Sequence, residues 1–77
     1  MNMSPEEALK VAHKRLEDGL VDVSDGDTWE EISYNEWDAN YWQDGDTIKI
    51  AVYRVIPDNE GGQVDPNEFY TKETIWH

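Results

Sequence analysis

The sequence predicts an α+β fold in which an N-terminal helix packs on an antiparallel sheet of three to four strands, with a possible short second helix. Three observations lead to this prediction: a helix start signal at residue 4, a run of strand-forming residues at 48–56, and two Asp-Gly turns, each followed by a strand-forming segment. With 77 residues, 38% of them apolar, the chain is expected to form one small acidic domain over residues 1–77.

The first element is a helix predicted over residues 5–18. Ser4 can cap the helix, Pro5 suits its first position, and Glu7 stands three residues after Ser4, as in a capping box. Gly19 can adopt the left-handed conformation that often ends a helix. The helical repeat predicts a buried stripe of Leu9, Ala12 and Leu16, with Ala8 and Val11 beside it.

Two Asp-Gly-Asp-Thr turns, at residues 25–28 and 44–47, are expected to lead into strands. The first would follow a short strand at 20–23 and precede a strand at 28–32. The second precedes the strand at 48–56, which is expected to be central because both of its faces are partly apolar. One face carries Ile48, Ile50, Val52 and Ile56, and the other carries Ala51, Tyr53 and Val55.

Pro57 is expected to end the central strand, and a polar loop then leads to a last strand at 68–76, antiparallel to it. Residues 33–42 are predicted to form the short second helix, because Ser33 and Glu36 have capping-box spacing. Tyr34, Trp37 and Tyr41 would then share one helical face. The competing interpretation of this segment is an aromatic-rich loop.

The acidic charge of the chain is concentrated in one segment. The formal net charge is −12, from 18 Asp and Glu residues against 6 Lys and Arg residues, and residues 16–48 contain eleven of the acids and no base. Such a surface repels nucleic-acid phosphates and anionic lipids, so direct binding to nucleic acid or membrane is not expected. A basic protein is therefore the expected partner; the oligomeric state is not predicted.

The residue types available argue against catalysis, so the protein is not expected to be an enzyme. The chain has no cysteine, His77 is the last residue, and His13 lies on the predicted helix among apolar positions and lysines. Neither Asp-Gly turn has the ligand spacing of an EF-hand loop, which leaves only weak divalent binding at the turns as an alternative. No cofactor or metal is expected. The lack of cysteine and of any apolar membrane span predicts a cytoplasmic protein.

In size, acidity and lack of cysteine the chain resembles the small DNA-mimic proteins of phages and mobile elements, such as anti-restriction and anti-CRISPR inhibitors. The resemblance is compositional and covers no motif, so it assigns no residue. It implies an inhibitor that occupies the basic nucleic-acid channel of a defence complex. The alternative is an acidic adaptor or regulatory subunit, such as an antitoxin-like or host-takeover protein, that binds a basic partner without mimicking DNA.

The candidate contact residues come from the acidic segment. Alternate residues of a strand project to one side about 6.6 Å apart, close to two phosphate steps of about 3.4 Å each along one DNA strand. Most aromatic residues are expected in the core, but one or two exposed among acids would suit the binding of Arg and Lys. The candidates are Glu30, Glu31, Glu36, Asp38, Asp44 and Asp46, with Trp37 or Trp42 as an anchor.

We predict that moderate salt raises the melting temperature. Eleven like charges within residues 16–48 repel one another in the folded state, and the Debye length falls to about 10 Å at 0.1 M salt. Thermal unfolding followed by circular dichroism at several salt concentrations tests this. A melting temperature that falls steadily from low to moderate salt would instead show that the carboxylates are held in favourable pairs.

Overall fold

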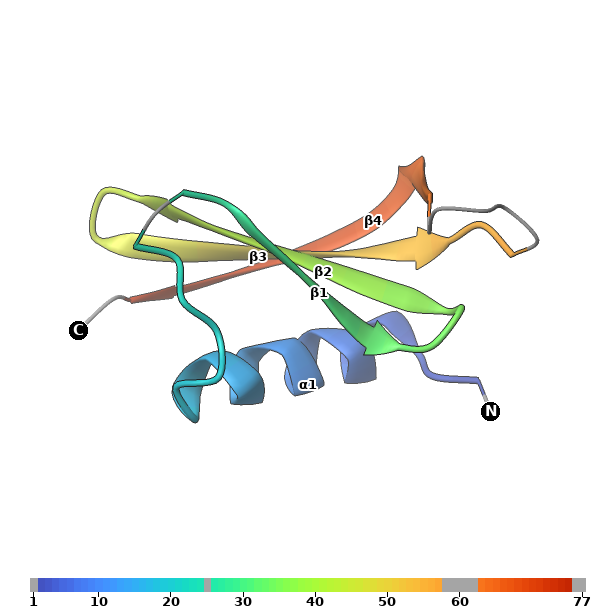
Figure 1. The fold of residues 1–77 in the computed structure, drawn as a ribbon, viewed down its shortest axis with the longest axis horizontal. Coiled ribbons are helices and arrows are strands. Elements are labelled where there is room, and N and C mark those ends of the chain that lie inside the picture. Colours follow the sequence, from blue (N-terminus) through green and yellow to red (C-terminus); the bar gives the residue numbers. More distant parts are fainter. Residues whose placement is uncertain (1, 25, 58–62, 76–77) are drawn as a thin grey trace.

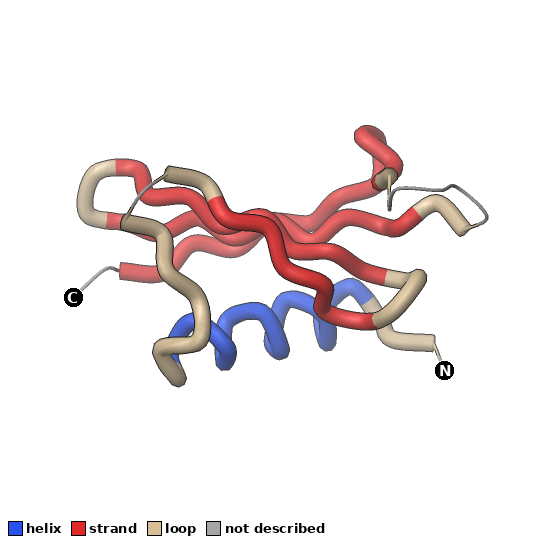
Figure 2. The backbone as a smooth tube through the Cα atoms, viewed as in Figure 1, coloured by secondary structure: helices blue, strands red, loops and turns tan. Residues whose placement is uncertain are grey.

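The computed structural model describes residues 2–24, 26–57 and 63–75. Its elements, in chain order, are α1 (Pro5–Glu17), β1 (Thr28–Ser33), β2 (Trp37–Asp44), β3 (Thr47–Val55) and β4 (Val64–Ile75). The four strands form one antiparallel sheet in the order β1-β2-β3-β4. Figure 1 and Figure 2 show α1 lying along one face of this sheet. The predicted α+β fold is confirmed.

The signals that predicted α1 are present as hydrogen bonds. Ser4 Oγ accepts the Glu7 N–H at 3.1 Å, which satisfies one of the unpaired donors of the first turn. At the other end Gly19 has a φ of 75° and donates its N–H to the Leu16 carbonyl at 3.1 Å. This positive φ suits glycine and lets the chain turn back toward the sheet.

The core lies between α1 and the sheet face that α1 covers. Ala8 and Ala12 are fully buried at the centre of the helix contact, while Leu9 and Leu16 pack against the core from its sides. The small side chains on the contact line allow the helix backbone to approach the sheet closely. The sheet contributes six fully buried side chains, namely Trp37, Ala39, Tyr41, Ile48, Ile50 and Val52.

The prediction of a second helix at residues 33–42 is wrong, as is the loop alternative. Ser33 and Glu36 do interact, through a Ser33 Oγ to Glu36 Oε1 hydrogen bond of 2.9 Å, but they close the hairpin turn between β1 and β2. Asn35 takes a φ of 58° within that turn. From Trp37 onward, alternate residues face the core, which is the period of a strand.

Smaller differences concern the ends of the strands. Residues 20–23 form an irregular connection rather than a strand, although Val21 and Val23 are buried in the core. Ile56 lies just beyond β3 and is only partly buried. The last strand begins at Val64, four residues earlier than predicted, and Trp76 lies outside the described residues.

Replacing Tyr41 by Phe should destabilise the fold by about 1 kcal/mol, or roughly 4–8 °C in melting temperature. The buried Tyr41 hydroxyl donates a 3.0 Å hydrogen bond to the Ala12 carbonyl and so ties β2 to α1. Burial and the nearby Glu30 charge raise the pKa of Tyr41 to about 12, so the hydroxyl keeps its proton at neutral pH. Thermal unfolding checks the effect.

The matched control is Tyr34→Phe, because the Tyr34 side chain is 84% exposed. The same change of one hydroxyl at that position should leave the melting temperature within about 2 °C of the wild type. Equal shifts in the two variants would contradict the assignment of a stabilising hydrogen bond to Tyr41.

Candidate functional site

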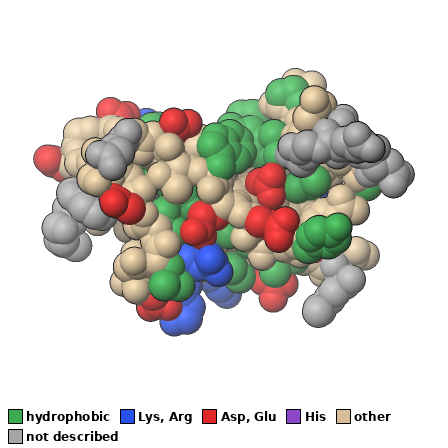
Figure 3. Space-filling model, in the orientation of Figure 1, with side chains coloured by type: hydrophobic (Ala, Val, Ile, Leu, Met, Phe, Trp, Pro, Cys, Tyr) green, Lys and Arg blue, Asp and Glu red, His purple; other side chains and the backbone are tan. Residues whose placement is uncertain are grey.

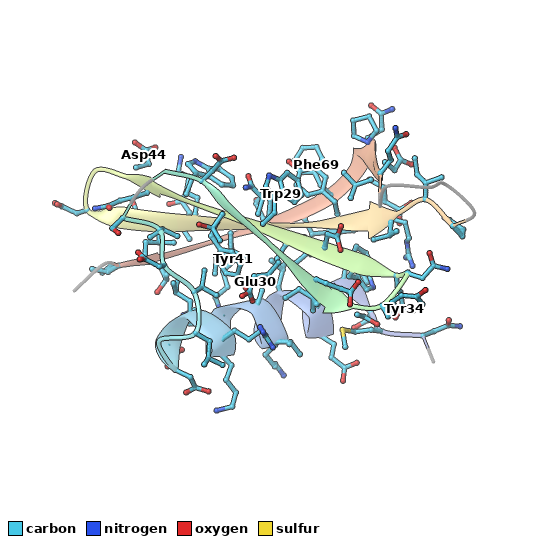
Figure 4. All side chains as sticks on the ribbon, in the orientation of Figure 1. Trp29, Glu30, Tyr34, Tyr41, Asp44 and Phe69 are labelled. Carbon is cyan, nitrogen blue, oxygen red and sulfur yellow. The ribbon has the colours of Figure 1, made fainter. Side chains whose placement is uncertain are left out.

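The face of the sheet turned away from α1, here called the open face, carries the side chains that alternate with those of the core. In Figure 4 Trp29 and Phe69 lie on this side, whereas Tyr41 and Glu30 point toward the helix. Figure 3 shows hydrophobic side chains gathered above the sheet, with acidic side chains around them. By strand register the open face includes Trp29, Glu31, Asp38, Asn40, Trp42, Asp44, Lys49, Ala51, Tyr53, Phe69, Thr71 and Glu73.

Three aromatic rings form a continuous row across the open face. The ring centroids of Trp29 and Tyr53 are 5.3 Å apart, and those of Tyr53 and Phe69 are 5.4 Å apart. Neighbouring strands are about 4.8 Å apart, so β1 and β3 are separated by roughly twice that distance, with β2 between them. The rings of Trp29 and Tyr53 must therefore lean over β2. Trp29 and Phe69 remain 50% and 48% exposed.

Two carboxylates stand beside this aromatic row. Glu31 and Asp38 are direct cross-strand partners on β1 and β2, and Asp38 is in turn the partner of Tyr53. Like charges directly opposite one another destabilise a sheet. Burial raises the pKa of Asp38, and the charge of Glu31 raises it further. Within the described part of the chain, neither side chain has an ion-pair or hydrogen-bond partner.

The end of the open face near the β2–β3 turn is electrically more balanced. Lys49 Nζ lies 3.0 Å from Asp44 Oδ2 and 3.9 Å from Glu73 Oε1. The hydrogen bond to Asp44 and the surrounding negative charge raise the pKa of Lys49, which therefore stays protonated at neutral pH. Among the described carboxylates of the open face, those of Glu31 and Asp38 therefore have no ion-pair partner.

The structure divides the predicted contact residues into separate groups. Glu31, Asp38, Trp42 and Asp44 share the open face, and Asp46 is exposed in the turn between β2 and β3. The remaining three candidates, Glu30, Glu36 and Trp37, lie elsewhere and interact within the protein.

Glu30 and Glu36 have internal structural partners. Glu30 Oε1 accepts a 2.7 Å hydrogen bond from Arg15 Nε, which ties β1 to α1. Glu36 Oε2 accepts the backbone N–H of Met3 at 2.9 Å, and this bond lowers the pKa of Glu36. Neither carboxylate is free to form a continuous acidic row with Glu31 and Asp38.

The assignment of Trp37 as a surface anchor has to be corrected, because its side chain is fully buried. Its indole N–H donates a 2.8 Å hydrogen bond to the Met3 carbonyl. The guanidinium of Arg54 lies 4.3 Å from the ring centroid, and Arg54 Nε also donates a 2.9 Å hydrogen bond to Glu68 Oε2. Trp37 is therefore an internal cation–π partner.

Sequence reasoning missed the residues that form the aromatic row, Trp29, Tyr53 and Phe69. The available signal was the second apolar face of the central strand, formed by Ala51, Tyr53 and Val55. A sheet covered by one helix cannot bury both faces, so one of these two apolar faces had to remain open. The sequence did not show which aromatic residues on the other strands would extend it.

A second cluster, at the C-terminal end of α1, contains a histidine, but the contacts of its ring are not those of a histidine in nucleophilic catalysis. His13 Nε2 lies 3.2 Å from Glu17 Oε1 and 3.3 Å from Thr74 Oγ1, so both oxygens share one ring nitrogen. A catalytic histidine uses one nitrogen for the nucleophile and the other for the carboxylate that orients it. We interpret the cluster as a contact between α1 and β4.

No family model, curated protein or solved structure matches this chain. In the three described ranges, no group of three or more His, Asp or Glu side chains is arranged to hold a metal ion. No helix among the described residues has the length and apolar character needed to cross a membrane. The open face is therefore interpreted from its own chemistry.

Replacing Asp38 by Asn should stabilise the protein at neutral pH by about 0.5 kcal/mol, or a few degrees in melting temperature. The pKa of Asp38 is raised on folding, so the folded state binds a proton more tightly than the unfolded state. The ionised Asp38 carboxylate therefore lowers the stability of the fold at pH values above its pKa in the folded protein. This loss of stability disappears as the pH falls below the pKa of an Asp side chain in the unfolded chain, about 3.9. The variant's advantage should disappear over the same range.

Urea unfolding of both proteins between pH 3 and pH 7 checks this sign. Asp46→Asn is the matched control, because Asp46 is exposed in the turn and also lies in the acidic segment. A wild-type protein more stable than Asp38→Asn at pH 7 would mean that Asp38 is favourably paired.

Proposed function

We propose that this protein is a non-enzymatic acidic binding protein whose open face occupies a basic surface of a partner protein. The observation that carries the proposal is the opposed pair of Glu31 and Asp38 beside half-exposed aromatic rings. The arrangement costs stability in the isolated protein, and a cation placed between the two carboxylates would remove that cost. Aromatic and acidic groups together suit the binding of Arg and Lys side chains.

The charge of the whole molecule supports a basic partner. A net charge of −12 accelerates association with a positively charged protein and repels nucleic acid and anionic lipid. Four of the six Lys and Arg residues form internal ion pairs, at Lys14, Arg15, Lys49 and Arg54. We place this function in the cytoplasm, consistent with a chain that has no cysteine.

The geometry favours an adaptor or regulatory subunit over a DNA mimic whose carboxylates imitate a long row of phosphates. Of the acidic pairs with two-residue spacing, Glu36 lies in a turn and Asp38 in β2. Asp44 is the last residue of β2, and Asp46 lies in the hairpin turn that follows. Asp25, the first member of the remaining pair, lies outside the described residues. The described carboxylates therefore do not form a regular line, and only Glu31 and Asp38 lie together beside the aromatic rings.

DNA mimicry is the second candidate, and the observation that favours it is the concentration of charge. Residues 16–48 contain eleven acids and no base, a density suited to the basic nucleic-acid channel of a defence complex. In this form the protein would be a phage or mobile-element inhibitor of the anti-restriction or anti-CRISPR type. It differs from the adaptor in one respect, because it must exclude nucleic acid from the surface that it occupies.

The contact surface is tested with the double variant Glu31→Gln/Asp38→Asn. We expect it to bind the basic partner roughly tenfold more weakly than the wild type, because it removes two charges from the proposed contact. The partner is captured on immobilised wild-type protein from a bacterial lysate, purified, and its affinity measured by calorimetry. The matched control, Glu6→Gln/Glu7→Gln, removes two exposed charges from α1. Equal affinity of the two double variants would contradict the proposal.

Competition with nucleic acid separates the two candidate functions. The purified partner is titrated with this protein in the absence and presence of a saturating DNA duplex. An adaptor should bind with the same affinity in both titrations, whereas a mimic should be displaced by the duplex. A partner with no affinity for nucleic acid would exclude mimicry and retain the adaptor.

A further inference from the structure

The open face contains a hollow of about 300 Å³ at the end of the aromatic row, lined by Trp29, Asp38, Gln63 and Val64. Its walls are chemically different from one another. Trp29 supplies an aromatic ring that is half exposed, Asp38 supplies a carboxylate, and Val64 supplies an apolar surface. Glu31, the cross-strand partner of Asp38, adds a second carboxylate beside the hollow.

We propose that this hollow receives an arginine side chain presented by the basic partner. The inference rests on the proposed function and specifies its central contact. A guanidinium placed here would contact the Trp29 ring and be neutralised by Asp38, while the methylene groups of its side chain would pack against Val64. The occupant is inferred from charge complementarity, because the described lining of the hollow contains an aromatic ring and a carboxylate but no base.

The protein already holds one of its own arginines in this way. On the helix side of the sheet, the Arg54 guanidinium lies 4.3 Å from the centroid of the Trp37 ring and is hydrogen bonded to Glu68 at 2.9 Å. At the hollow, Trp29 and Asp38 present the same two kinds of group. Within the described ranges no Arg or Lys of the chain pairs with Asp38, so this second arrangement lacks the cation that the first contains.

Arginine fits the hollow better than lysine for two physical reasons. Its planar guanidinium can stack on the indole of Trp29 while its N–H groups point toward a carboxylate in the same plane. It is also more weakly hydrated than an ammonium group, so it loses less on entering a partly apolar site. The Asp38 carboxylate is partly buried, and this burial raises its pKa and strengthens its attraction for a cation.

The test uses defined peptides and does not require the natural partner. A short glycine peptide with two arginines is titrated into ¹⁵N-labelled protein, alongside peptides in which both arginines are replaced by lysine or by uncharged citrulline. We expect the arginine peptide to shift the indole N–H of Trp29 and the backbone amides of Asp38 and Val64. The lysine peptide should bind several-fold more weakly, and the citrulline peptide should cause no comparable shifts.

Variants then identify the contributing groups. Trp29→Leu should weaken binding of the arginine peptide roughly fivefold, and Trp29→Tyr should restore most of the affinity because it retains an aromatic face. The control Tyr34→Leu removes an aromatic that is 84% exposed, lies away from Trp29 (Figure 4) and does not line the hollow, and it should not change the affinity. An unchanged indole N–H signal of the buried Trp37 confirms that each variant is folded.

The outcomes distinguish failure of this inference from failure of the proposed function. If Glu31→Gln/Asp38→Asn weakens peptide binding but Trp29→Leu does not, the arginine site is refuted and the acidic contact surface stands. If neither variant weakens binding, both proposals fail. Equal affinities for the arginine and lysine peptides, or shifts centred on Asp44 and Glu73, would also overturn the assignment of arginine to this hollow.

Discussion

The structure depends on one geometric constraint: a single helix of 13 residues has to supply the cover of a four-stranded sheet. A helix is about 10 Å across, so α1 can protect one face and no more. The covered face contains the largest buried side chains, and Tyr41 and Trp37 connect it by hydrogen bonds to α1 and to the N-terminal segment. The opposite face has to be compatible with water.

On the open face, the aromatic side chains of the sheet itself take the place of a second helix. By strand alternation Ala51 and Val55 lie on this side, outside the core cluster under α1, yet they are 1% and 5% exposed. The aromatic row of Trp29, Tyr53 and Phe69 lies on the same face and shields its backbone and small side chains. Half of the Trp29 and Phe69 surfaces stay in contact with water, so the arrangement that protects the sheet also leaves aromatic surface available for binding.

The distribution of ion pairs follows from the same two-sided construction. On the helix side, Arg15 forms an ion pair with Glu30 and so connects α1 to β1. Arg54 forms an ion pair with Glu68 and so connects β3 to β4. Lys49 balances Asp44 and Glu73 at one end of the open face. Among the described residues, no such cation pairs with Glu31 or Asp38. The position of this pair beside the Trp29 ring supports the proposal that this part of the surface binds a basic partner.

The sequence by itself determined the elements whose signals are local. The capping residue Ser4, the terminating Gly19 and the Asp-Gly turn at residues 44–47 act through hydrogen bonds and backbone angles within a few residues. The alternating apolar residues of the central strand likewise predicted its two neighbours. The concentration of acids in residues 16–48 predicted a negatively charged surface, but not how that charge divides between the two sides of the sheet.

Tertiary structure decided the rest, because the deciding interactions are distant in sequence. The hydrogen bond between Ser33 and Glu36 is compatible with a helix cap and with a hairpin turn. The hairpin forms because β2 pairs with β3 along its whole length, from Trp37 with Arg54 to Asp44 with Thr47. A strand projects alternate residues to opposite faces, so that choice buried Trp37 and placed Asp38 on the open face. The candidate site exists only in the folded sheet, since its aromatic row and acidic pair come from β1, β2, β3 and β4.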